Sequence, residues 1–152
     1  MRLFDFLSYL FNSNFEKPVK INVKELELIL KTLERTTNAI NLTPLRIKTM
    51  DLEYNLYSKE EVKSFLSKDL FNLKKTSKEF DCDDFSLIML GRLREKFRVS
   101  AIGLAISVGH VYILFIDKNK QLYAIEPQTD QLISLSDFKK NKMYYPVSMI
   151  II

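Results

Sequence analysis

The sequence has few of the residues that build covalent or metal-bound cross-links. Its 152 residues include one cysteine, one histidine, three glycines and no tryptophan. A single cysteine cannot form an intramolecular disulfide, so we expect a fold that does not depend on an oxidising compartment. One cysteine and one histidine also fall short of the four ligands of a Cys/His zinc site, which excludes structural zinc of that kind.

Long apolar runs are absent as well. No stretch approaches the roughly 20 apolar residues that a membrane-spanning helix needs. The apolar N-terminus from Met1 to Phe11 is interrupted by Asp5, and no small-residue cleavage site follows it. We therefore expect no signal peptide, no transmembrane segment and a cytoplasmic location. This segment suits a short helix packed on the core, with a membrane-surface anchor as the alternative.

The charge balance gives little indication of a nucleic-acid partner. The formal charge of +4 arises from 23 basic and 19 acidic residues, and the lysines are scattered along the chain. We expect no nucleic acid among the partners. Apolar residues at 47% and charged residues at 28% are typical of a globular protein, and the length fits a single domain.

Three stretches in the first part of the chain have helical signatures. Capping pairs, in which an Asn or Ser is followed three residues later by Glu, open helices near residues 22–42 and 58–70. A third helix is predicted to begin at Asp81 and to run to about residue 97. The stretch 45–57 has extended character without a strong period and stays unassigned.

The second part of the chain consists of short apolar runs rich in Val, Ile, Tyr and Phe, separated by turn residues. Such consecutive runs predict an antiparallel meander. The predicted strands lie near residues 100–107, 110–117, 121–126, 131–135 and 143–152. Helices followed by strands indicate an α+β fold, which we interpret as one domain over 1–152, helical over about 1–97 and β over about 98–152.

The one cysteine stands at the start of the third predicted helix. Asp81 is a natural N-cap, which puts Cys82 at the first helical position, over unpaired backbone N–H groups. The partial positive charge of a helix N-terminus favours a thiolate and is a recurrent way to activate cysteine. Phe85 and Met89 share its helix face, so the sulfur should face a cleft. The alternative is that Cys82 is a small, inert hydrophobe.

The one histidine opens a predicted strand, from whose end its side chain can reach a cleft. A loop of two or three residues after this strand sets His110 opposite position 126, 127 or 128, which makes Glu126 or Gln128 its neighbour. We choose Glu126, because its charge would also stabilise an imidazolium. Cys82, His110 and Glu126 are thus the candidate catalytic residues of a Cys-His-Glu triad.

Three acidic residues surround the cysteine. Asp81, Asp83 and Asp84 place negative charge near the thiol and disfavour a thiolate. One explanation is structural: Asp81 caps the helix and the other two interact favourably with its dipole. The other is a hard cation such as Ca²⁺, held by Asp83 or Asp84 with Gln128 as an amide-oxygen ligand from across the cleft. Both explanations stay open at the level of sequence.

Three short motifs carry a resemblance to a known family. They are Phe80–Phe85 (FDCDDF), Gly109–Tyr112 (GHVY) and Ile125–Asp130 (IEPQTD), in that order. In them the second half of the chain resembles the papain-like protease domain at the C-terminus of the Marasmius oreades agglutinin family of fungal lectins. The resemblance implies a papain-like fold, with the nucleophile helix packed on the β-meander. It further implies catalytic roles for Cys82, His110 and Glu126, and activity that depends on calcium-like ions.

The leading expectation is therefore a cysteine peptidase acting on a protein or peptide substrate, and two alternatives accompany it. The helix start at Asp81–Cys82 also looks like that of the peptidoglycan-cleaving NlpC/P60 peptidases, although their Ser-Gly is replaced here by Asp83–Asp84. The second alternative is a non-catalytic binding protein that keeps a papain-like shell. The chain has no sugar-binding trefoil domain, so we do not expect lectin activity to transfer from the family.

Overall fold

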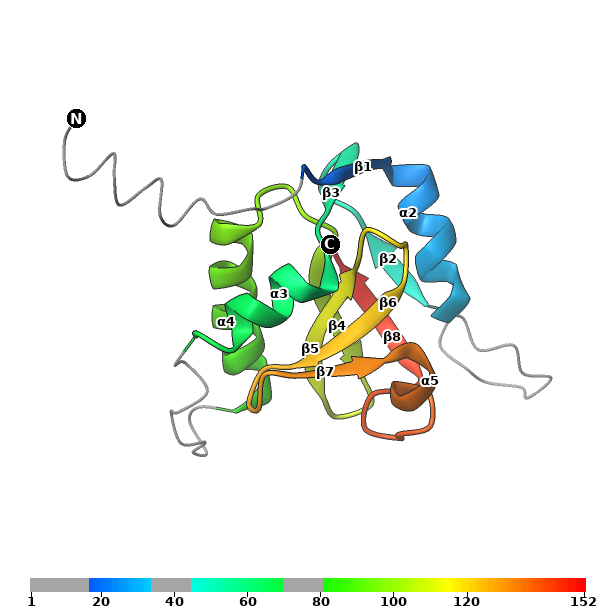
Figure 1. Cartoon of the computed structure of the whole chain (residues 1–152). Helices are drawn as coiled ribbons and strands as arrows, with labels where there is room; N and C mark the ends of the chain where they lie inside the picture. Colours follow the sequence, from blue (N-terminus) through cyan, green and yellow to red (C-terminus); the bar gives the residue numbers. More distant parts are fainter. Residues whose placement is uncertain (1–16, 34–44, 70–80) are drawn as a thin grey trace.

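The computed structural model describes residues 17–33, 45–69 and 81–152, whose helices and strands form an α+β fold (Figure 1). The strands are β1 (Val19–Asn22), β2 (Arg46–Lys48), β3 (Glu53–Leu56), β4 (Ile102–Ser107), β5 (Val111–Ile116), β6 (Leu122–Glu126), β7 (Gln131–Ser134) and β8 (Val147–Ile151). The helices are α2 (Val23–Leu30), the 3-10 turn η1 (Lys31–Leu33), α3 (Lys59–Leu66), α4 (Cys82–Lys96) and α5 (Leu135–Phe138).

The predicted antiparallel meander is present in the larger of two sheets. Strands β4, β5, β6 and β7 pair consecutively and antiparallel. The last strand, β8, pairs antiparallel with β4 and parallel with β2, which gives the order β2-β8-β4-β5-β6-β7. The unassigned stretch 45–57 contains β2 and β3, and β3 forms a small antiparallel sheet with β1. The part before residue 97 is thus not purely helical.

The capping residues define the helix starts as the sequence predicts. Asn22, Ser58 and Asp81 are the N-caps of α2, α3 and α4, and the latter two belong to complete capping boxes. Helix α2 ends at Leu30 and continues only as η1, while the rest of the predicted helix 22–42 lies outside the described residues. The apolar segment 1–11 lies outside them too. In the described ranges no helix is long and apolar enough to cross a membrane.

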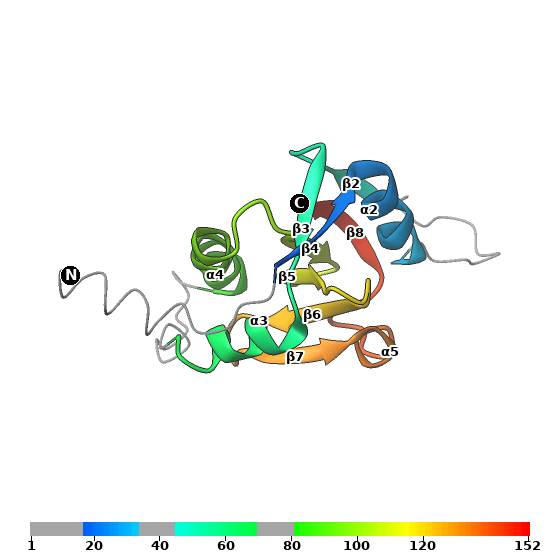
Figure 2. The same cartoon turned by 45° about the horizontal axis from the view of Figure 1, so that its top comes forward.

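The larger sheet is the middle layer of the molecule, because it buries apolar side chains on both faces. Helices α3 and α4 cover one face, and α2, α5 and the small sheet cover the other; Figure 2 shows α4 and α2 on opposite sides of it. Side chains alternate between the faces along β5: Ile113 and Phe115 pack toward α4, and Tyr112, Leu114 and Ile116 pack toward the opposite layer. This arrangement fixes α4 against β4 and β5 and so positions the start of the helix.

Candidate functional site

The start of α4 carries the cysteine. Asp81 has extended backbone, its side chain accepts from the backbone N–H of Asp83 at 3.4 Å, and the Asp84 side chain accepts from the Asp81 N–H at 3.3 Å. Cys82 therefore occupies the first helical position, as predicted. It is half-buried, whereas Phe85 on the same helix face is fully buried.

A serine one turn into α4 connects the helix to the sheet. The Ser86 hydroxyl lies 2.7 Å from the carbonyl oxygen of Cys82 and 2.8 Å from that of Val111, the first residue of β5. A hydroxyl has one proton to donate, so it serves one of these carbonyls at a time. Ser86 is fully buried, so water does not compete for its hydroxyl. Its hydrogen bonds connect the first turn of α4 to the start of β5, the strand that follows His110.

A buried polar network surrounds His110. Its Nε2 lies 2.8 Å from Oε2 of Glu126, and the Tyr144 hydroxyl donates to the same oxygen at 2.7 Å. The backbone N–H of Gln128 donates to Oε1 of Glu126 at 3.3 Å. The rings of Tyr112 and Tyr144 flank the imidazole, with centroids 5.9 Å and 5.3 Å away. The structure therefore brings His110 and Glu126 together, and both carboxylate oxygens of Glu126 have partners.

The electrostatics of the network favour an ionised Glu126. Burial alone would raise the pKa of this carboxyl, but the hydrogen bonds from His110 and Tyr144 outweigh it, so the pKa lies below its ordinary value. Burial first, and then the Glu126 carboxylate, raise the pKa of the Tyr144 phenol. Tyr144 consequently stays protonated and donates its hydrogen bond over the ordinary pH range. At the centre of the network, the ionised carboxylate of Glu126 accepts hydrogen bonds from His110 and Tyr144.

The structure does not join the thiol to this network by a hydrogen bond. In the part of the chain that is described, no hydrogen bond links the sulfur of Cys82 to His110. Activation of a cysteine by an adjacent base requires the two side chains to come within hydrogen-bond reach. The site thus consists of a half-buried thiol at the start of α4 and, separately bonded, a buried His110–Glu126–Tyr144 network.

No sequence pattern distinguishes Tyr144 or Ser86 as a residue of this site. Tyr144 lies in the loop between α5 and β8, where no periodic pattern marks a contact with β5 or β6. Ser86 appears in sequence as an ordinary helix residue. One sequence feature bears on this part of the network: His110 and Tyr112 are two residues apart, so their side chains lie on the same face of the strand. On that face, the Tyr112 hydroxyl donates to the Tyr144 carbonyl at 2.8 Å.

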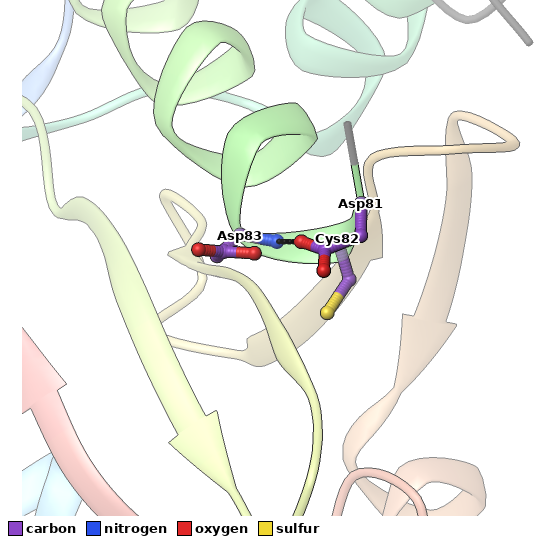
Figure 3. Close-up of side chains that lie close together, drawn as sticks. All are labelled: Asp81, Cys82 and Asp83. Carbon is purple, nitrogen blue, oxygen red and sulfur yellow. Dashed lines mark hydrogen bonds between the residues drawn. The ribbon is translucent and has the colours of Figure 1, made fainter. Parts of the chain in front are cut away.

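Two of the acidic residues at the start of α4, Asp81 and Asp83, lie close together (Figure 3). The ligand atoms of Asp81, Cys82 and Asp83 all lie within 4.8 Å of one another. Hydrogen bonding with Asp83 raises the pKa of Asp81, and the same interaction lowers the pKa of Asp83. Asp84 is engaged in the capping box. The structural explanation therefore covers all three acids, because Asp81 and Asp84 form the capping box and Asp83 lies in the first turn, where the helix dipole favours a carboxylate. The carboxylate of Asp83 also lies beside that of Asp81.

Calcium binding at this helix start stays a prediction. Carboxylate oxygens suit Ca²⁺, and Asp81 and Asp83 offer them, while the thiol is a poor partner for so hard a cation. The sequence predicted Asp83, Asp84 and Gln128 as the ligands of this ion. In the structure, the carboxylate that lies within ligand distance of Asp83 is that of Asp81.

Millimolar Ca²⁺ is expected to raise the thermal midpoint of the wild type. An ion that binds the native state alone would add about 2.7 kcal/mol to the free energy of unfolding at a hundredfold excess over its dissociation constant. Thermal unfolding of wild type and Asp83→Asn, with Mg²⁺ as the control ion, measures the effect. Equal midpoints with and without Ca²⁺ would leave capping as the only role of these acids.

Comparisons with known proteins identify the fold. No protein-family model and no curated protein sequence matches the chain. Among solved structures, the chain is similar to a Polyporus squamosus lectin structure described as "PSL1a-E64 complex", with a TM-score of 0.64 and 17% identity over 88% of this chain. It is also similar to Polyporus squamosus lectin bound to the human-type influenza-binding epitope Neu5Acα2-6Galβ1-4GlcNAc, with a TM-score of 0.63 and 14% identity over 88% of this chain.

The likeness covers part of these proteins. The chain spans about half the length of the lectin chains, 50% of the first and 49% of the second. At such low identity, the likeness shows that the chain shares a fold with one half of each lectin.

These comparisons correct the functional predictions from sequence. The resemblance to the papain-like protease domain of the Marasmius oreades agglutinin family, the cysteine peptidase function and its NlpC/P60-like alternative are contradicted, because the similar structures are lectins and neither is named as a peptidase. The same holds for a peptide substrate and for classification as a hydrolase. The physical reason is that short motifs have structural uses: the Asp-Cys-Asp-Asp motif forms a capping box and the His-Glu pair forms a buried network.

Proposed function

We propose that the chain is a non-catalytic binding domain and that its ligand is a carbohydrate. The proposal rests on the hydrogen bonds of His110: its Nε2 is bonded to Glu126, and no hydrogen bond connects His110 to Cys82 within the described residues. The likeness to lectin chains supports a binding role.

In this proposal the buried network has a structural role. His110 stands just before β5, Glu126 ends β6 and Tyr144 lies in the loop that leads to β8, so their hydrogen bonds tie three segments of the larger sheet. Buried polar groups are costly unless they are fully bonded, and bonded ones specify a single arrangement of the chain. We infer that Glu126 serves to fix the β4–β5 turn and the loop before β8.

The described elements are proposed to act as one domain. The two apolar clusters use opposite faces of the same sheet, and strand β5 contributes side chains to both. A binding surface on either face of the molecule would therefore be supported by the larger sheet, which forms the middle layer.

The proposal is tested by the retention of the whole chain on an array of neutral and sialylated oligosaccharides. We expect the wild type to bind at least one class of saccharide and Cys82→Ala to bind it equally, because the thiol takes no part. Cys82→Ser, which replaces the thiol with a hydroxyl of similar size, is the matched control. An array that retains no wild-type protein, or loses only the Cys82→Ala protein, would contradict the proposal.

A further inference from the structure

A groove lies where the start of β6, the end of β7 and α5 meet. Figure 1 shows these three elements next to one another. Its volume is about 450 Å³, within the range of roughly 300 to 1,000 Å³ that is typical of small-ligand sites. The residues that line it are Gln121, Leu122, Tyr123, Ser134, Leu135, Ser136 and Lys139. We call this the β6–α5 groove. It is distinct from the His110–Glu126–Tyr144 network.

The geometry points to the β6–α5 groove as a saccharide-binding site, an inference that rests on the proposed carbohydrate ligand. A saccharide offers hydroxyl groups, which donate and accept hydrogen bonds, next to apolar C–H faces. A site for it needs acceptors and donors on the rim and an apolar floor. The groove supplies each of these.

The acceptors come from Ser136 and Gln121. The Ser134 hydroxyl donates to Asp137 at 2.6 Å, so in its 2.9 Å contact with Ser136 the proton must come from Ser136. That leaves the lone pairs of the Ser136 oxygen as acceptors. The amide nitrogen of Gln121 donates to the Asn119 carbonyl at 3.4 Å, and among the described residues nothing donates to its Oε1. Both side chains belong to exposed residues and favour a ligand that has hydroxyl protons to give.

The donor comes from Lys139. Its ammonium donates to the Thr32 carbonyl at 2.8 Å, and because an ammonium has three protons, two are left for ligand oxygens. This bond also holds the exposed side chain in place. The rim of the groove thus offers two acceptor oxygens and one anchored donor.

The floor and the charge of the groove narrow the ligand class further. Leu122 is 4% exposed, and Leu135 and Tyr123 are half-buried, so the lining includes apolar surface for C–H groups. Lys139 is the one cation among the lining residues, and beside them Lys140 lies 3.7 Å from Asp137. A polyanion such as a nucleotide phosphate would be repelled by the nearby Asp137 carboxylate. A neutral or singly charged saccharide fits this balance better.

Three substitutions in the full-length chain test the inference on the same oligosaccharide array. Ser136→Ala and Gln121→Leu each remove an acceptor, and Lys139→Gln removes the ammonium. Each is expected to weaken binding of the saccharide that the wild type selects by about five- to tenfold, the effect of one lost hydrogen bond. Lys140→Gln and Gln131→Leu are matched controls outside the groove, and we expect them to bind within about twofold of wild type.

The outcomes separate the two proposals. If the wild type binds a saccharide and all three groove variants bind it as tightly, the groove is not the site, while the proposed function stands. If the wild type binds none, the carbohydrate function itself is contradicted. Because Lys139→Gln also loses the bond to Thr32, thermal unfolding of each variant is measured, and Ser136→Ala, which keeps that bond, remains decisive if Lys139→Gln unfolds.

Discussion

Replacing Glu126 with alanine is expected to lower the free energy of unfolding by about 3 to 5 kcal/mol, because the buried donors of His110 and Tyr144 lose the acceptor that they share. Glu126 is 7% exposed and accepts from His110, from Tyr144 and from the backbone at Gln128. Without Glu126, the buried donors of His110 and Tyr144 would have no acceptor, and water cannot replace it. Urea unfolding followed by circular dichroism measures the change.

A surface acid provides the control for this substitution. Glu53 lies 3.6 Å from Lys20, but both side chains are about two-thirds exposed, so we expect Glu53→Ala to change stability little. Equal effects of Glu126→Ala and Glu53→Ala would show that the network does not hold the fold together.

The stabilisation by Glu126 should depend on pH in a defined direction. Its pKa in the folded protein lies below the ordinary value, so its contribution is present above the unfolded-state pKa of about 4.3 and is lost as pH falls through the folded-state pKa. The difference in stability between wild type and Glu126→Gln should therefore be greatest near neutral pH and shrink in acid. Unfolding curves at several pH values between about 3 and 7 would reveal it.

The second large effect is expected at Gly103 in β4. A Cβ atom placed there would lie 2.7 Å from the Cβ and 2.8 Å from the Cα of Ile152, and it would also press on the carbonyl oxygen of Ile151. Most of these atoms belong to the backbone of the adjoining chain end, which cannot move aside without disturbing the pairing of β4 with β8. Gly103→Ala should therefore destabilise the protein by about 2 to 3 kcal/mol or more, as overpacking does.

Gly91 in α4 is the matched control for Gly103. A Cβ atom there would meet nothing within 4 Å, and the position is inside a helix. Gly91→Ala is accordingly expected to stabilise the protein by about 0.5 to 1 kcal/mol, through helix propensity. Thermal unfolding of both variants should give shifts of opposite sign. A stable Gly103→Ala protein would mean that β8 does not approach β4 as closely as described.

The local features of the fold could be predicted from the sequence, because they depend on neighbouring residues. The N-cap at Asp81 and the strands β4 to β7 follow from capping pairs and short apolar runs. The proximity of His110 and Glu126 follows from strand register: Ile113 pairs with Ile125, so continuing the pairing places His110 opposite position 128 and diagonal to Glu126.

Other features could not be predicted because they depend on pairings that are distant in the sequence. Strand β2 is three residues long and exists through its parallel pairing with β8, about one hundred residues later. Tyr144 reaches Glu126 from a loop without periodicity. The function predicted from short motifs was wrong for a related reason, since a capping box and a buried His-Glu pair can serve the structure alone.

Hydrolysis assays show whether the Cys82 thiol has a catalytic role. Wild type and Cys82→Ala are incubated with casein and a panel of fluorogenic peptides, with and without millimolar Ca²⁺, and cleavage is followed over time. We expect the wild type and Cys82→Ala to be indistinguishable from buffer in every condition, because the thiol takes no part in catalysis. Cleavage by the wild type that disappears in Cys82→Ala would contradict this expectation.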